Sequence, residues 1–592
     1  MPAPPASPAH IAAPVAPPAA APDAAAADSP AAAAGRIAGV PAAWFWAGLL
    51  LLAGVWFFTL DVRHLLRSDE GRYAEIAREM FVSGDWVTIR YQGLKYFEKP
   101  PFHLWMTVLA YHAFGVGDWQ ARLWVALSGA LGVAAVALAA RRWWGPRTAL
   151  LAALALLAAP AWNLGAHFNS LDMSVSGALA VVLAALLLAQ HPATGARARR
   201  GWMLAAWAAM AVAVLTKGLI GIVLPGLALV VYTLIARDWA LWRRLHLVGG
   251  TALFLLISAP WFVLVSLRNP EFPQFFFIHE HWDRYTSTIH HRNQPLWYFV
   301  PQLIGGFLPW LGLAPRGAAA LRHEWAGRAF RPLLFSAAWA GAIFVFFSLS
   351  DSKLPGYILP VYPALALLAA AGLARLAAAP AGAAAWRRQI AAMLALAVLG
   401  FAASWLPGRW PAGGTDGAQL RAYGLWLAAA CALLAAGLAG AWRLHRRGAL
   451  VPSIGAYALA FFGATTLGLL GHETIGRPAS GADLVPAIRA VLTPQMPLYG
   501  VRLLDHTLPF YLRHTLIMVE KPDELAFGTR REPAKWLPTL AAFEQIWRQG
   551  PHAMALMSHP TYARLQRDQL PMAVVAQDER RVVVANFDPP AR

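Results

Sequence analysis

Two aspartates and a small set of Lys and Arg side chains lie directly beside long apolar stretches of this chain. Asp69 follows the first stretch and Asp172 opens the fourth. A carboxylate beside a membrane is costly, so each is a candidate catalytic group. Lys99, Lys217 and Arg284 lie near the ends of such stretches, where cations can bind phosphate and Arg offers a bidentate fork. The alternative is that these side chains only extend to the membrane interface and bind lipid headgroups.

Four histidines gather in one further polar loop, at positions 279, 281, 290 and 291. One or two of them, with Glu98 from an earlier loop, could hold a structural zinc that clamps the two loops together. We take Glu98 and His279 as the candidate ligands. Their spacing matches no standard zinc motif, and ordinary loop polarity is the alternative interpretation.

The composition sets the class of protein that carries these groups. The 592 residues include 49 Lys and Arg against 30 Asp and Glu, a net charge of +19, yet only 13% are charged and 58% are hydrophobic. A soluble domain has roughly 25% charged residues, so a water-soluble enzyme is excluded. A single cysteine, Cys431, excludes a disulfide framework, a thiolate zinc cluster and an iron–sulfur site.

Apolar runs near the length needed to cross a bilayer, about 20 residues, follow one another along the chain. We predict thirteen spans: 41–60, 119–140, 148–164, 170–189, 202–216, 218–236, 248–267, 298–314, 331–349, 356–374, 389–407, 422–441 and 451–470. If the first runs outward, six inner connections each carry three or four Arg: 141–147, 191–200, 237–246, 316–331, 375–388 and 443–447. Such a bias is typical of cytoplasmic loops.

The opposite, outer face then receives the unusual polar residues, including a long loop between the first two spans. Within it, Tyr73, Ile76, Met80 and Phe81 recur at helical spacing, which predicts an amphipathic helix in the membrane interface, capped by Ser68 or Asp69. Residues 101–115 begin with two prolines and predict a second interfacial helix.

The two ends of the chain differ from the middle. Residues 1–40 are rich in Ala and Pro without apolar periodicity, which predicts a disordered cytoplasmic tail rather than a signal peptide. Residues 41–471 form the predicted transmembrane domain. Residues 472–592 have ordinary charge, short apolar stretches and a strand-like run at 581–587, which predict a small outer α/β domain. The fold class is therefore an all-α polytopic membrane protein with an added α/β domain.

Several motifs resemble those of the aminoarabinose transferases of bacterial lipid A modification. They are DEGRY at 69–73, GDW at 84–86, YFEKPP at 96–101, LDM at 171–173, TKG at 216–218, the loop 279–284, PLWY at 295–298 and SKLPGY at 352–357. The acidic pair alone indicates only the wider clan of polyprenyl-phosphate-sugar transferases, which includes the protein O-mannosyltransferases. The FEKPP and SKLP motifs favour the narrower family.

The resemblance implies transfer of 4-amino-4-deoxy-L-arabinose from undecaprenyl phosphate to lipid A at the periplasmic side of the inner membrane. In the family, that reaction lowers the negative charge of the outer leaflet and reduces the action of cationic antimicrobial peptides such as polymyxin. The motif match favours Lys99 and Lys217 as ligands of the donor phosphate, and Arg284 is a further candidate from its place at an outer helix end. The hydroxyls of Tyr96 and Tyr357 could add hydrogen bonds to the same phosphate, although aromatic belts also enrich Tyr at this depth. Lys353 is a further cation at an outer helix end.

The resemblance leaves the role of one carboxylate open. Asp69 is the likelier participant of the two aspartates in such a family: it could orient donor or acceptor, or pair with the amino group of the sugar. A hydroxyl acceptor would instead require it as a base. The family also carries a metal near the histidine loop.

Two other classes remain as alternatives. One is a related transferase with another sugar or acceptor, such as a protein O-mannosyltransferase. The other is a secondary transporter, which places its charged or unwound elements near the midplane and often shows internal repeats. Here the charges lie at one face and no repeat is evident, so we favour the transferase.

Overall fold

The computed structural model describes residues 36–37, 40–283, 294–324, 330–378, 382–406 and 416–589. Most of the predicted tail at 1–40 therefore lies outside the described residues. The chain forms two compact units that divide after Leu50. The first holds the short antiparallel pair β1 (Arg36–Ile37) and β2 (Val40–Pro41) and the start of α2 (Ala42–Phe58). All contacts below belong to the second unit.

Long apolar helices make up most of that unit, as the sequence predicts. Eight helices in the described ranges are long and apolar enough to cross a membrane, or nine if one bent pair counts as a single span. Each of the thirteen predicted stretches falls on helical segments, and the number of spans stays a prediction. The long helices of the unit are α5 (Asp118–Leu157), α7 (Leu171–Gln190), α8 (Ala196–Lys217), α9 (Ile220–Ala236), α10 (Leu247–Arg268), α14 (Pro332–Leu349), α15 (Tyr362–Ala378), α16 (Gly382–Ala403), α17 (Gly417–Arg446) and α18 (Leu450–Gly471), of which α8 and α9 do not belong to the eight.

Helix α5 covers the predicted span 119–140 and the first part of the span 148–164. Its 40 residues would measure about 60 Å as one straight helix, twice the thickness of the hydrocarbon core. The backbone leaves helical geometry at Gly145, with φ +87°, and Pro146 follows. Because a residue with a Cβ strongly resists that φ, this glycine permits the turn between the two halves.

One predicted span is not a straight helix. The stretch 298–314 runs through η3 (Leu296–Tyr298), α12 (Phe299–Gly306), η4 (Leu308–Leu313) and the start of α13 (Ala314–Glu324). Its two halves meet at an angle of 86°. Pro309 lies just after the bend and cannot donate the backbone hydrogen bond that would continue the first half.

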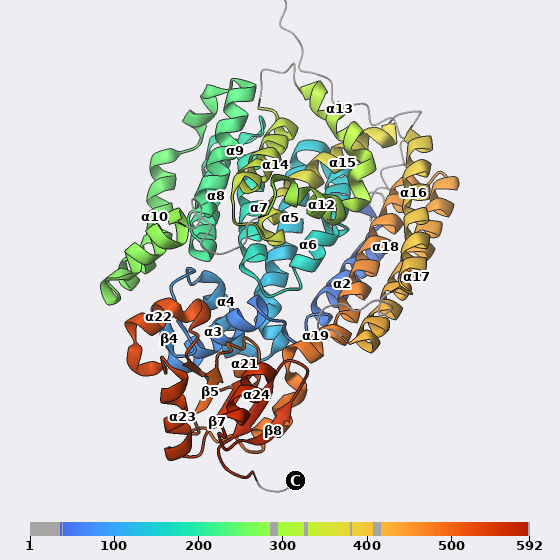
Figure 1. The fold of residues 1–592 in the computed structure, drawn as a ribbon. Helices are drawn as coiled ribbons and strands as arrows, with labels where there is room; N and C mark the ends of the chain where they lie inside the picture. Colours follow the sequence, from blue (N-terminus) through green and yellow to red (C-terminus); the bar gives the residue numbers. More distant parts are fainter. Residues whose placement is uncertain are drawn as a thin grey trace, which may run out of the picture. The chain divides into compact units, whose positions relative to one another are not determined.

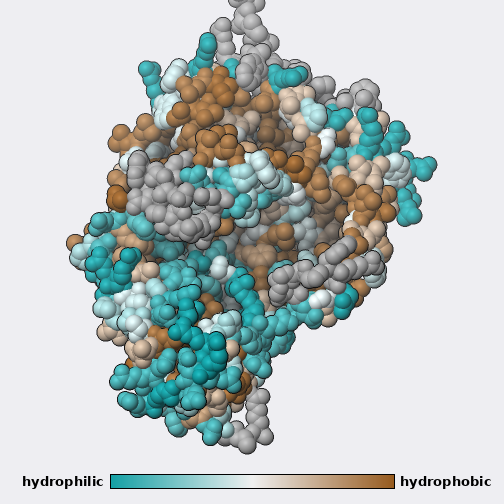
Figure 2. All heavy atoms as spheres, viewed as in Figure 1, coloured by the Kyte–Doolittle hydropathy of each residue, from teal (hydrophilic) through white to brown (hydrophobic). Residues whose placement is uncertain are grey.

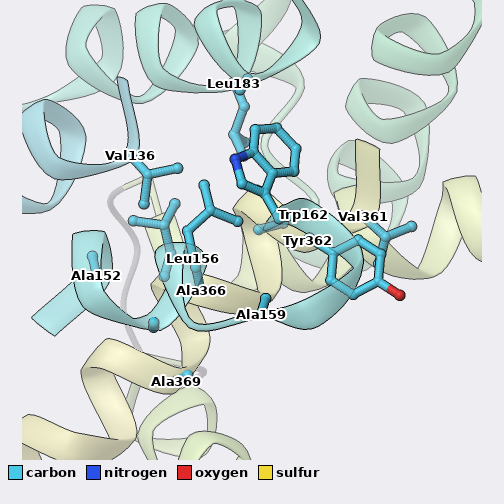
Figure 3. Close-up of a cluster of buried hydrophobic side chains, with 14 of the residues drawn as sticks. Val136, Ala152, Leu156, Ala159, Trp162, Leu183, Val361, Tyr362, Ala366 and Ala369 are labelled. Atoms are coloured by element: carbon cyan, nitrogen blue, oxygen red, sulfur yellow. The ribbon is translucent and has the colours of Figure 1, made fainter. Parts of the chain in front are cut away.

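The helices pack around large aromatic side chains. Trp162, on the short helix α6 (Pro160–Gly165), is fully buried and lies among Val136, Leu156 and Leu183 (Figure 3). Its indole N–H donates to the carbonyl of Gly129 at 3.1 Å. A Cβ at position 132 would lie 2.3 Å from the Trp162 ring, so glycine there makes room for the indole.

The long loop before α5 folds into compact structure. It contains α3 (Asp69–Ser83), the hairpin β3 (Arg90–Tyr91) and β4 (Leu94–Lys95), and α4 (Phe102–Phe114). Both predicted helices are present. However, α3 buries ten of its fifteen residues, including Glu75 and Arg78, because α4, β3 and α21 (Leu508–Leu512) pack around it. More than one face of α3 is therefore covered by protein, its place in the membrane interface stays a prediction, and Ser68 makes no side-chain cap.

The C-terminal residues form the predicted α/β domain. Five strands lie in the order β6-β5-β7-β9-β8. They are β5 (Leu498–Val501), β6 (Ile517–Val519), β7 (Met554–Met557), β8 (Ala573–Gln577) and β9 (Val582–Ala585), with helices α22 (Ala526–Arg531), α23 (Leu540–Gln549) and α24 (His559–Arg567). Strand β5 pairs in parallel with β6 and β7, whereas β9 is antiparallel to both neighbours.

Strand β9 confirms the run predicted at 581–587, and all four of its residues are buried. The surface reflects the two environments: hydrophobic residues gather over the long helices and hydrophilic ones over the C-terminal elements (Figures 1 and 2).

Candidate active site

A pocket of about 140 Å³ brings together four of the residues that the sequence singled out. Glu98 and Lys99 come from the loop between β4 and α4, Lys217 ends α8, and Tyr357 lies on η5 (Pro355–Val361). The remaining walls are Ile220, Glu280, Phe346, Phe347, Ser350 and Ser352. The pocket is thus built by segments that are more than two hundred residues apart in the sequence. Its lining combines charged and aromatic side chains.

Lys217 is the best positioned cation of this pocket. Its ammonium forms an ion pair with Asp172 and lies 4.6 Å from the centre of the Tyr357 ring. Both charged side chains are about one-seventh exposed, at 14% each. A cation in the last turn of a helix also interacts favourably with the helix dipole. Asp172 therefore holds Lys217 in the pocket.

Two glycines explain why these motifs need their particular residues. Gly218 ends α8 at φ +87°, a conformation that disfavours side chains and turns the chain away directly after Lys217. A Cβ at Gly356 would lie 2.7 Å from Oδ2 of Asp172. Glycine at 356 therefore lets the Tyr357 segment approach the Asp172 carboxylate.

Lys99 is the second cation of the pocket. Its ammonium donates to the carbonyl of Glu98 at 2.8 Å and lies 3.3 Å from Oε2 of Glu280. Glu280 is buried, with 2% of its side chain exposed, whereas Lys99 is 17% exposed. The buried carboxylate thus fixes a cation that still reaches the pocket.

Asp69 lies in a second cluster, at the first turn of α3. Its side chain is 42% exposed, and Oδ1 is 3.6 Å from the guanidinium of Arg72. That guanidinium also forms an ion pair of 3.0 Å with Glu524 of the C-terminal domain and contacts the Tyr96 hydroxyl at 3.5 Å. Tyr96 is buried and reaches Arg72, and it does not line the pocket that holds Lys99.

Electrostatic interactions connect the two clusters. Burial raises the pKa of Glu524 to about 7, with further contributions from the negative charges of Glu98 and Asp69 and an opposing one from Arg72. Burial, reinforced by Glu98, raises the pKa of Tyr96 well above its usual value. Glu98, which lines the pocket, therefore also acts electrostatically on the cluster around Asp69.

Sequence reasoning missed the contribution of the C-terminal domain. We predicted no catalytic constellation there, yet Glu524 joins Arg72, and Nδ1 of His506 lies 3.5 Å from Oε1 of Glu524. Burial and the charge of Arg72 lower the pKa of His506 to about 4. Glu524 is separated from Arg72 by more than 450 residues and belongs to no motif, so only the fold reveals it. Arg72, in contrast, stands within the DEGRY motif.

Glu70, the neighbour of Asp69, has a structural role. It is buried and forms an ion pair of 2.7 Å with Arg122 of α5, and it accepts a 3.0 Å hydrogen bond from the backbone N–H of Asn169. Burial alone would raise the pKa of Glu70, but the charges of Arg122 and Arg63 and the hydrogen bonds from Arg122 and Asn169 together outweigh it and hold that pKa below its usual value. Because Asn169 lies three residues before Asp172, Glu70 links the chain segments that carry the two predicted catalytic aspartates.

The other cations have different outcomes. Lys353 is buried, and its ammonium donates to the backbone carbonyls of Gln294 and Ser350. It thereby braces the loop beside the pocket, and the sequence hypothesis of a further pocket cation does not fit this contact. Arg284 lies outside the described residues.

The described residues do not complete a metal site. Among them no group of three or more His, Cys, Asp or Glu is arranged to hold a metal ion. Glu98 and His279 alone are fewer than the three or four protein ligands that zinc takes. His290 and His291 lie outside the described residues, and His281 is described in its backbone only. The metal stays a prediction.

Long apolar helices, a cationic pocket at their ends and an attached α/β domain are the architecture of a polytopic membrane glycosyltransferase. The chain resembles ArnT from Cupriavidus metallidurans bound to undecaprenyl phosphate, at 55% identity and a TM-score of 0.88, over 92% of this chain and 98% of that one. The apo structure of the same protein matches at a TM-score of 0.87 with the same identity and coverage. The chain belongs to the aminoarabinose transferase family.

Family models and curated relatives agree with this assignment. The model for the aminoarabinose transferase C-terminal domain matches residues 484–586, and the model for dolichyl-phosphate-mannose-protein mannosyltransferase matches residues 98–263. Undecaprenyl phosphate-alpha-4-amino-4-deoxy-L-arabinose arabinosyl transferases from Edwardsiella ictaluri and Pseudomonas aeruginosa are 34% and 36% identical over 57% and 55% of this chain. The matched region spans 60% and 58% of the length of those two relatives.

Proposed function

We propose that this chain transfers 4-amino-4-deoxy-L-arabinose from undecaprenyl phosphate to a phosphate of lipid A, at the periplasmic face of the bacterial inner membrane. The observation that carries the proposal is the pocket in which Lys99 and Lys217 converge beside Tyr357 at the ends of membrane helices. A relative with 55% identity has been crystallised with undecaprenyl phosphate. The modified lipid A would carry less negative charge and bind cationic peptides such as polymyxin more weakly.

The cations of the pocket act on the leaving group. In the transfer, an oxygen of the lipid A phosphate attacks the anomeric carbon of the sugar, and the bond from that carbon to the donor phosphate oxygen breaks. Negative charge then grows on the departing undecaprenyl phosphate. Lys99 and Lys217 stabilise that charge without moving, because Glu280 and Asp172 already hold them in place.

The exposed carboxylate of Asp69 fits an orienting role. A lipid A phosphate is ionised at neutral pH, so it needs no general base. The amino group of the sugar is a cation, and Asp69 can pair with it because the Asp69 side chain is 42% exposed and its contact with Arg72, at 3.6 Å, is loose. Glu524, which shares Arg72, adds a second acid beside it.

The orientation in the membrane rests on the charge of the loops. Arg-rich connections such as 141–147 and 191–200 lie at the ends of helices opposite to Lys99, Lys217 and the C-terminal domain in our assignment. Cysteine substitutions should be labelled by an impermeant reagent within 472–592 and not within 191–200. The reverse pattern would overturn the proposed orientation.

Mass spectrometry of lipid A tests the reaction itself. Cells that express the chain should contain lipid A with the mass increment of one aminoarabinose residue, and cells without it should not. Unmodified lipid A in an expressing strain that makes the donor would contradict the proposal.

A hydroxyl acceptor is the second candidate, and the mannosyltransferase model that matches residues 98–263 favours it. A Ser or Thr hydroxyl must lose its proton, so Asp69 would then act as a base. In that case the activity of the Asp69→Asn variant should recover in part as pH rises. With a phosphate acceptor, the variant should lose activity at every pH. A pH profile with each acceptor class separates the two.

A structural zinc that joins Glu98 and His279 is proposed separately, on the resemblance and on the two side chains. Elemental analysis of the purified chain should then find about one zinc per molecule, and a His279→Ala variant should contain less. A metal-free wild-type protein would remove this proposal.

A further inference from the structure

A second, larger groove lies far from the pocket of Lys99, at the other ends of α8 and α10. It has a volume of about 920 Å³. Its walls come from the start of α8, the short helix η1 (Trp239–Arg244) and the first turns of α10. Helices α8 and α10 pack against each other, and both belong to the group of long helices in Figure 1.

The groove is held in a fixed shape. The indole N–H of Trp207 on α8 donates to the carbonyl of Leu245 at 3.0 Å, directly before α10 begins. A Cβ at Gly250 would meet the Trp207 ring, so the two helices touch closely there. The indole N–H of Trp242 donates to Thr233 at 3.1 Å, which anchors η1. The walls are thus built from braced segments.

Three basic side chains line the groove where α8 and α10 begin. Arg200, Arg243 and His246 are exposed, and in the described part of the chain no acidic side chain lines the groove or forms an ion pair with them. The nearby acid Asp238 is occupied, because it pairs with Arg244 at 2.8 Å. These basic side chains therefore carry uncompensated positive charge.

Backbone donors point to the same kind of ligand. The first intrahelical bond of α10 runs from the N–H of Gly250 to the carbonyl of His246, and His246 provides no side-chain cap. The amides of Leu247, Val248 and Gly249, which line the groove, are left for an external acceptor. A helix N-terminus beside two arginines favours an anion with several oxygens.

The groove also has an apolar wall, formed by side chains of α10. Val248 and Leu256 are 89% and 71% exposed, and only 22% of the apolar window of α10 is buried in the protein. A small free anion would leave this wall without a partner. A molecule with a phosphate at one end and hydrocarbon at the other matches both the basic side chains and the apolar wall.

We propose that this groove binds an anionic phospholipid of the inner leaflet, with its phosphate on Arg200 and Arg243 and its acyl chains along α10. Arg-rich connections 191–200 and 237–246 both flank the groove and place it on the cytoplasmic side in our topology. The site is independent of the proposed transfer reaction, because none of its residues belongs to the pocket of Lys99 and Lys217.

Native mass spectrometry of the purified full chain tests the proposal with phosphatidylglycerol and phosphatidylethanolamine as probes. Phosphatidylglycerol should bind more tightly, and an Arg200→Gln/Arg243→Gln variant should bind it at least about tenfold more weakly. A matched control, Arg197→Gln/Arg443→Gln, removes the same charge from exposed positions outside the groove and should bind it as the wild type does.

Three results would overturn the proposal. Equal binding of the two lipids, or equal losses in the two double variants, would mean that general surface charge is sufficient. Displacement of the lipid by inorganic phosphate at the same concentration would mean a site for the free anion. If the groove variant fails to fold, photoactivatable phosphatidylglycerol can be cross-linked to the wild-type chain, where it should label 200–256 and not other membrane helices.

Discussion

The ion pair of Lys217 and Asp172 gives the sharpest test of how the pocket works. If Asp172 acts only by holding Lys217, then removing the lysine makes the aspartate irrelevant. Three variants decide this: Lys217→Gln, Asp172→Asn and the double substitution. Each changes a charge while preserving most of the side-chain volume, so the pocket of about 140 Å³ should keep its shape.

The expected size of the effect follows from the strength of a charge-assisted hydrogen bond. Such a bond contributes roughly 1.5–3 kcal/mol, so Lys217→Gln should lower kcat/KM by about 10- to 150-fold. Asp172→Asn should lose a similar or smaller amount, because the lysine stays but is no longer fixed. The double variant should be no worse than Lys217→Gln alone. Independent roles would instead add, to a loss of roughly 10²–10⁴-fold.

The assay is transfer by purified enzyme with undecaprenyl-phosphate-linked aminoarabinose and lipid A, read by mass spectrometry. Arg564 and Asp568, an exposed pair 3.9 Å apart on α24, provide the matched control. Neutralising that pair should leave kcat/KM unchanged. Additive losses at Lys217 and Asp172 would refute the positioning role and would favour direct contact between Asp172 and a substrate.

Three further predictions concern other parts of the site. Lys99→Ala should reduce lipid A modification in cells at least about tenfold at equal expression, whereas Lys521→Ala, on the C-terminal domain, should not. Burial raises the pKa of Glu524 from 4.5 to about 7, so between these pH values the folded chain keeps a proton that the unfolded chain has lost. The free energy of unfolding should therefore fall by up to roughly 3 kcal/mol as pH rises from about 4.5 to about 7. Glu524→Gln should remove this dependence in thermal unfolding. Arg122→Met should cost about 3–5 kcal/mol by leaving Glu70 charged and buried, and Arg122→Met/Glu70→Gln should recover most of it in the same measurement.

Much of the fold could be predicted because the signals are local. In a membrane, the backbone N–H and C=O groups of an apolar run of about 20 residues must be hydrogen-bonded within the run, which favours a helix. Each predicted stretch falls on helical segments. The strand at 581–587 was recognisable from three consecutive valines, and it lies buried between β7 and β8. The bend of 86° near Phe307 cannot be predicted from hydropathy, because hydropathy does not show the direction of a helix axis. Pro309 lies inside the predicted span 298–314, which hydropathy alone shows as continuous.

The burial of α3 was missed for a different reason. Its apolar residues recur at helical spacing, which is also the pattern of a helix on a membrane surface. The polar side chains that distinguish it, Glu75 and Arg78, are buried as an ion pair of 2.6 Å. A sequence shows the charge of these side chains but not their partners. Its pattern therefore predicts one buried face for α3, whereas other protein elements cover most of this helix.

The pair Asp69 and Glu70 shows where prediction of the site must stop. The two residues are adjacent, acidic and part of one motif, and both begin the same helix. Although they are adjacent, their side chains have opposite surroundings. Asp69 is 42% exposed, whereas Glu70 is 3% exposed and bonded to Arg122 and Asn169. A buried, fully paired carboxylate has no lone pair left for a substrate, while the exposed one does. The motif therefore locates the site, but only the packing of α5 against α3 assigns the structural role to Glu70 and leaves the chemistry to Asp69.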